Sequence, residues 1–134
     1  RVYYMSEDLL NILIIEDNKD LADIMCELLA LSGHRVSVAD NGTEGIAKAR
    51  ELRPDAIICD IGLPDMSGYE FAKIIRQDTE LKNTYLIASS GYAQQEDVER
   101  SRVTGFNRHL AKPVSFDTLE TILKCVIKNA YSAG

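Results

Sequence analysis

The chain has 134 residues, 46% of them hydrophobic, and a formal net charge of −6. This length and apolar content predict a single domain that can bury a core of its own. The negative charge disfavours direct binding to a nucleic-acid backbone, and the longest apolar runs are too short to span a bilayer.

The cysteines and the first residues indicate the setting of this domain. Cys26, Cys59 and Cys125 form no C-x-x-C pair, which argues against a zinc site, and their odd number argues against a disulfide framework. We therefore expect reduced thiols and a cytoplasmic location. Because the sequence does not begin with methionine, residues 1–8 are expected to be a tag or linker remnant. The domain is expected to occupy residues 9–131, with no output domain after it.

Short apolar runs predict five strands along the chain. They lie at residues 11–15, 35–38, 56–59 and 85–88, with a weaker fifth at 106–110. Strands that are apolar on both faces are typical of a parallel sheet covered by helices.

Helical patterns separate the strands. The first helix has one apolar face, formed by Leu21, Ile24, Met25, Leu28 and Leu29, and is expected to end at Gly33, before an exposed turn at His34. Further helices are predicted at residues 43–52, 67–77 and 94–103, of which the last is mostly polar. The third is expected to turn Phe71, Ile74 and Ile75 inward.

The final predicted helix begins with Ser115 as its N-cap. Its expected buried face consists of Phe116, Leu119, Ile122, Leu123, Val126 and Ile127. Strand and helix therefore alternate five times, which predicts an α/β fold with a doubly wound parallel sheet and right-handed crossovers.

Polar residues follow the predicted strands. In chain order these residues are Glu16, Asp17, Asp60, Ser89, Ser90 and Lys112. In open α/β sheets, ligands bind at the carboxyl ends of the strands, so we expect these side chains to share one edge of the sheet.

Three carboxylates at one edge repel each other, and a divalent hard cation such as Mg²⁺ relieves that repulsion. Glu16, Asp17 and Asp60 suit this role. An aspartate carboxylate such as that of Asp60 can also accept a phosphoryl group as an acyl phosphate. The transfer needs charge stabilisation at the phosphoryl oxygens, which the ammonium of Lys112 and the hydroxyl of Ser90 can supply. Each residue alone has an ordinary explanation as a cap, turn or solvated side chain, and only their joint placement favours a site.

The sequence at these residues resembles the receiver domain of bacterial response regulators. The matching segments are IIEDN at residues 14–18, CDIGLPDMSGYE at 59–70, ASSGYA at 88–93 and LAKP at 110–113. The resemblance covers about residues 11–129 and is greatest to receivers attached to hybrid sensor histidine kinases. It implies a flavodoxin-like sheet with strand order 2-1-3-4-5 and a phosphorelay function.

The resemblance also implies roles for the residues of the site. Asp60 matches the phosphoacceptor, while Asp17 matches a direct ligand of Mg²⁺ and Glu16 a ligand through water. The backbone carbonyl of Gly62 matches a further metal ligand. Lys112 matches the phosphate-binding lysine, and its bond to Pro113 is expected to be cis.

Switching residues are implied in the same way. Ser90 matches the hydroxyl that moves toward the phosphoryl group. His109 stands where receivers usually carry an aromatic switch residue, so a tyrosine-type switch is not expected. We expect Tyr92 to shield the phosphoryl group from water and slow its loss.

The implied partners are a histidine kinase or a histidine phosphotransfer domain, and a downstream protein. The kinase or phosphotransfer domain is expected to dock on the first helix near Ala22 and Cys26. The polar fourth helix, the fifth strand and the last helix form the expected switching face. The chain is expected to catalyse only its own phosphorylation and dephosphorylation, and not to be an enzyme otherwise.

Three alternatives remain at this point. A pseudo-receiver would keep the fold and take no phosphoryl group, although the complete set of acids, hydroxyl and lysine argues against it. A phosphatase with an aspartyl intermediate would require an acidic residue at the position of Gly62. A flavodoxin-like cofactor protein would want a hydroxyl-rich phosphate loop, whereas Glu16 and Asp17 would repel a phosphate.

Overall fold

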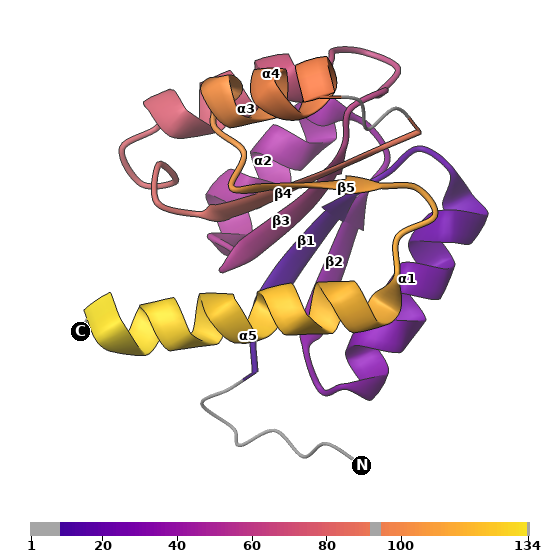
Figure 1. Ribbon diagram of the computed structural model, residues 1–134, viewed down its shortest axis with the longest axis vertical. Coiled ribbons are helices and arrows are strands. Elements are labelled where there is room, and N and C mark those ends of the chain that lie inside the picture. The colour runs from indigo at the N-terminus through magenta and orange to yellow at the C-terminus, as the bar shows by residue number, and fades with distance from the viewer. Residues whose placement is uncertain (1–8, 92–94, 134) are drawn as a thin grey trace.

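A computed structural model of the chain describes residues 9–91 and 95–133, and the side chains as far as Val126 (Figure 1). Five strands form one parallel sheet: β1 (Asn11–Ile15), β2 (Arg35–Ala39), β3 (Ala56–Asp60), β4 (Tyr85–Ser90) and β5 (Arg108–Ala111). Their spatial order is β2-β1-β3-β4-β5, which confirms the predicted flavodoxin-like topology. No helix among the described residues is long and apolar enough to cross a membrane.

Five helices connect the strands: α1 (Lys19–Leu31), α2 (Gly42–Leu52), α3 (Gly68–Gln77), α4 (Gln95–Thr104) and α5 (Phe116–Ala133). Figure 1 shows α1 and α5 on one face of the sheet, with α2 and α3 on the other and α4 beside α3. The helix starts follow their caps, since Asn18, Asn41 and Ser67 each accept a backbone N–H of the first turn. The predicted cap Ser115 likewise accepts from the backbone N–H of Thr118 at 3.3 Å.

Alternation along the strands divides the core into two layers. In β1, Leu13 and Ile15 pack toward α2 and α3, whereas Ile12 and Ile14 pack toward α1 and α5. Every residue of β3 is buried, as expected for a central strand covered on both faces. The two layers therefore hold the end of β3, and Asp60 with it, in a fixed position.

The start of α3 also depends on a close backbone approach. A Cβ atom added at Gly68 would lie 2.8 Å from Cα of Ile61 and 2.9 Å from the carbonyl oxygen of Asp60. Because both neighbours are backbone atoms, only glycine lets α3 begin directly against the end of β3.

Three predictions from the sequence were wrong in detail. The fifth strand begins at Arg108, while Phe106 precedes it and is buried in the core. Ile24 is 54% exposed, because the apolar stripe of α1 is wider than the surface that the sheet covers. His34 is 4% exposed and accepts the backbone N–H of Leu10 at Nδ1 (3.0 Å), so it is a buried hydrogen-bonding group and not part of an exposed turn.

The inward faces of the later helices agree with the sequence more closely. In α3, Phe71 and Ile75 are fully buried and Ile74 is half-buried. In α5, four of the predicted residues are buried and Phe116 packs half-buried against the same core layer. The side chain of Ile127 lies outside the described part of the chain.

Candidate phosphoacceptor and metal site

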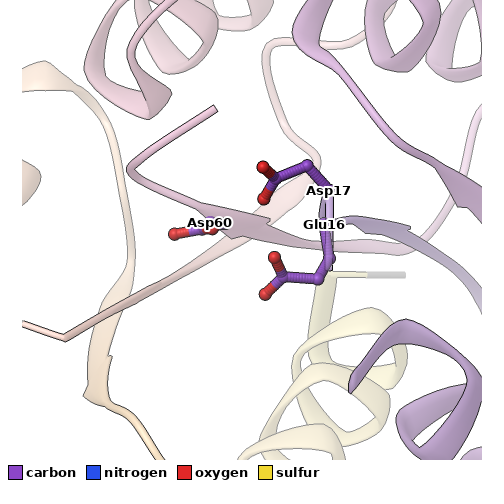
Figure 2. Close-up of side chains that lie close together, drawn as sticks. All are labelled: Glu16, Asp17 and Asp60. Atoms are coloured by element: carbon purple, nitrogen blue, oxygen red, sulfur yellow. The ribbon is translucent and has the colours of Figure 1, made fainter. Parts of the chain in front are cut away.

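Neighbouring strands bring three carboxylates together at the carboxyl edge of the sheet. Asp60 is the last residue of β3, and Glu16 follows the last residue of β1. The pairing of Ile15 with Cys59 places the two strand ends side by side. Oxygen atoms of Glu16, Asp17 and Asp60 lie within 4.8 Å of one another, and Figure 2 shows the carboxyl groups of Glu16 and Asp17 extending toward the side on which Asp60 lies.

Lys112 enters this site from the end of β5. Its Nζ lies 2.7 Å from Oε1 of Glu16 and 3.1 Å from Oδ2 of Asp60. Glu16 is 3% exposed and Asp60 8%, so both ion pairs are largely withdrawn from water. A lysine predicted from its position after the fifth strand therefore bridges two of the three predicted acids.

Burial and hydrogen bonding have opposite effects on the pKa of the Glu16 carboxyl. Burial raises the pKa of Glu16, the hydrogen bonds from Lys112 and from the backbone N–H of Asn18 lower it, and the nearby charge of Asp60 raises it again. The net shift is upward, so the site holds Glu16 ionised at some cost. For Lys112, burial lowers the pKa, but its hydrogen bonds to Glu16 and Asp60 outweigh burial and raise it.

The charges of the site fit a divalent cation. With all three carboxyl groups ionised, three negative charges face the single ammonium of Lys112, which leaves a formal charge of −2. Mg²⁺ prefers carboxylate and carbonyl oxygens and typically takes one or two carboxylates with waters. Glu16, Asp17 and Asp60 therefore form an acidic cluster of suitable chemistry and charge for this ion.

The loop after β3 is held at both of its ends. The backbone N–H of Gly62 donates to Oδ1 of Asp60 at 3.0 Å, which orients the carboxylate. Asp65 accepts from the backbone N–H groups of Gly42 (2.8 Å) and Thr43 (2.9 Å) and from the Thr43 hydroxyl (2.6 Å). These hydrogen bonds lower the pKa of Asp65 to about 2, and the one from the Thr43 hydroxyl has the largest effect. No role was predicted for Asp65, although it lies in the LPDM segment (residues 63–66), which is part of the family resemblance.

Ser90 and His109 are joined by a hydrogen bond. Ser90 is the last residue of β4, and its Oγ lies 2.8 Å from Nε2 of His109 on β5. On the other side of the ring, Nδ1 of His109 lies 2.6 Å from Oγ of Ser101 on α4. Ser101 was not predicted, because a serine in a charged helical segment gives no local sign of a long-range contact.

Three further predictions concern residues at or near the site. The peptide bond between Lys112 and Pro113 is cis, as predicted. Tyr92 lies outside the described residues, so its predicted shielding role stays a prediction. The predicted metal contact of the Gly62 carbonyl also remains a prediction.

The fold and this acidic edge define a class of protein: a doubly wound α/β domain with a candidate phosphoryl and metal site at the ends of β1, β3, β4 and β5. Residues 12–124 match the response regulator receiver domain family. The chain belongs to this family, which confirms the resemblance seen in the sequence. It is 34% identical over 120 residues to the polar-differentiation response regulator DivK of Brucella anthropi, across 90% of this chain and 98% of that protein.

Solved structures agree with this assignment. A CheY-like receiver domain protein from Methanospirillum hungatei matches with a TM-score of 0.86 and 28% identity, over 94% of this chain and 99% of that one. The receiver domain of a Pseudomonas aeruginosa sensor histidine kinase matches with a TM-score of 0.82 and 32% identity, over 90% and 98%. That second structure holds a magnesium ion coordinated in its active-site cleft.

Proposed function

We propose that this receiver domain accepts a phosphoryl group on Asp60 in a Mg²⁺-dependent reaction and thereby switches its contacts with other proteins. The donor is the phosphohistidine of a histidine kinase or of a histidine phosphotransfer protein. In the transfer, the N–P bond of the donor breaks and a P–O bond forms to a carboxylate oxygen of Asp60. One observation carries the proposal: Lys112 bridges Glu16 and Asp60 within a cluster of three carboxylates.

Each residue of the site has a distinct role in this proposal. Glu16, Asp17, Asp60 and the Gly62 carbonyl hold the cation, which neutralises charge on the phosphoryl oxygens when bound. The backbone N–H of Gly62 orients the Asp60 carboxylate. Lys112, already 3.1 Å from Asp60, supplies a fixed positive charge for the phosphoryl group.

Ser90 completes the proposed site as a hydroxyl donor to a phosphoryl oxygen. With His109, it links the site to the switching surface of the domain. The chain then catalyses only its own phosphorylation and dephosphorylation, and its output passes to a protein partner. Three free thiols support a cytoplasmic setting for this exchange.

The test is incubation with a small phosphodonor and Mg²⁺, followed by intact-mass measurement. We expect the mass of one phosphoryl group to be added to the parent chain, and none to be added after EDTA treatment or in Asp60→Asn. Asp55→Asn is the matched control, because Asp55 precedes β3 at the opposite end of the strand and accepts from the backbone N–H of Asn11 (2.7 Å). That variant is expected to take up phosphoryl normally. An unchanged parent mass would make the chain a pseudo-receiver.

A further inference from the structure

Helix α4 is attached to the rest of the domain by polar groups. The buried residues of this helix are Ser101 and Thr104, whereas Val98 and Val103 are 42% and 70% exposed. Ser101 is 1% exposed, and its hydroxyl lies between Nδ1 of His109 and the backbone carbonyl of Asp97 (3.0 Å). A continuous row of hydrogen bonds therefore runs from Ser90, at the site, to the backbone of α4.

The number of available hydrogens gives this row a direction. Ser101 has one hydroxyl hydrogen, which it donates to the carbonyl of Asp97 one helical turn earlier. Its oxygen must then accept from Nδ1–H of His109. A neutral imidazole carries only one N–H, so Nε2 of His109 accepts from the hydroxyl of Ser90.

We propose that Ser101 is a positioning residue for Ser90, and that the Ser90–His109–Ser101 row reverses its direction when Ser90 donates to a phosphoryl oxygen at Asp60. The inference rests on the proposed phosphoacceptor function. In the reversed row, Nε2–H of His109 donates to Ser90 and the hydroxyl of Ser101 donates to Nδ1. The two hydroxyls rotate, and the imidazole proton moves from Nδ1 to Nε2 by exchange with water, so no proton is gained or lost.

Reversal has a consequence in α4. The carbonyl of Asp97 loses the hydroxyl of Ser101 as a donor, and this helix lacks a buried apolar side chain among its described residues to compensate. Loss of one ordinary hydrogen bond corresponds to about a five-fold increase in local opening. We therefore expect phosphorylation to increase the rate of amide hydrogen exchange in α4.

Histidine NMR tests this directly, because the chain contains only His34 and His109. In ¹⁵N-labelled protein with Mg²⁺ at about pH 8, we expect the neutral ring of His109 to carry its hydrogen on Nδ1. On addition of beryllofluoride, a stable mimic of a phosphoryl group, protonation is expected to shift to Nε2. His34 is the internal reference, since Leu10 N–H donates to its Nδ1 and fixes its hydrogen on Nε2 in both states.

The variants separate positioning from a merely structural role. Ser101→Ala, checked for folding by circular dichroism, is expected to show mixed His109 tautomers before beryllofluoride and fast α4 exchange in both states. Ser101→Thr keeps the hydroxyl and is expected to restore the tautomer change. Binding of beryllofluoride is measured by ¹⁹F NMR, and Asp60→Asn, which should not bind it, is the control. The proposed reversal is overturned if beryllofluoride binds to the parent while the His109 tautomer stays the same. It is also overturned if Ser101→Ala switches like the parent. Absence of binding to the parent would remove the proposed function, and the row with it.

Discussion

Helices α4 and α5 follow successive strands of the same sheet but are attached by opposite means. The buried face of α5 is apolar, with Leu119, Ile122, Leu123 and Val126 all at most 7% exposed. The buried positions of α4 are the hydroxyl residues Ser101 and Thr104. Arg100 of α4 adds a cation–π contact, with its guanidinium 4.2 Å from the ring centre of Tyr69 on α3.

The two kinds of attachment differ in how they respond to a change at the site. Each fully buried aliphatic side chain contributes about 1.5–3 kcal/mol without regard to direction. A hydrogen bond contributes about 1 kcal/mol net and depends on which atom holds the hydrogen. Helix α4, which is held by a row of hydrogen bonds, can therefore respond to a new acceptor at Asp60. The apolar contacts of α5 do not depend on the positions of hydrogen atoms.

Removal of a buried apolar side chain from α5 is expected to have the largest effect on stability. Leu123→Ala removes a fully buried side chain from α5, and we expect it to lower the free energy of unfolding by about 2–5 kcal/mol. Urea denaturation followed by circular dichroism measures the change. Val103→Ala on α4 is the matched control, since Val103 is 70% exposed, and its effect is expected to stay within about 0.5 kcal/mol. Equal losses in the two variants would contradict the proposed difference in attachment.

The same contrast explains which parts of the fold the sequence could predict. The face of α5 was predicted well because burial of an apolar stripe is a local, periodic signal. The fifth strand was misplaced because Phe106 is apolar yet serves as a core residue before the strand, while Arg108 and His109 are polar residues within it. Apolar pattern alone does not distinguish these cases.

Hydrogen bonds between distant segments were the least predictable feature. His34 was expected in an exposed turn after Gly33, but it is buried and accepts the backbone N–H of Leu10, 24 residues away. Ser101 depends in the same way on how α4 packs against β5. By contrast, Glu16, Asp60 and Lys112 were predicted to meet because parallel strands align their carboxyl ends, and their contacts bear this out.

A smaller effect concerns the cation–π contact of α4. Arg100→Ala is expected to lower stability by about 0.5–1 kcal/mol, because the guanidinium over Tyr69 is at an exposed position. Its main consequence should be local, as faster amide exchange in α4 with α5 unchanged. Arg102→Ala is the control from the same helix: its ion pair with Glu99 is exposed and should contribute little. If the two variants showed the same exchange in α4, the Tyr69 contact would not help to hold this helix.

The smallest effect on stability is expected from His34, which lies near Glu120 of α5, and it depends on pH. Burial lowers the pKa of His34 from its ordinary value of 6.5, and the charge of Glu120 on α5 partly opposes this. As the pH falls below about 6.5, the unfolded chain takes up a proton that the folded chain resists, so the free energy of unfolding decreases. His34→Gln should remove this part of the pH dependence, and subtracting the urea-denaturation profile of the variant from that of the parent isolates the contribution of His34. Identical profiles would show that burial of His34 has no such cost.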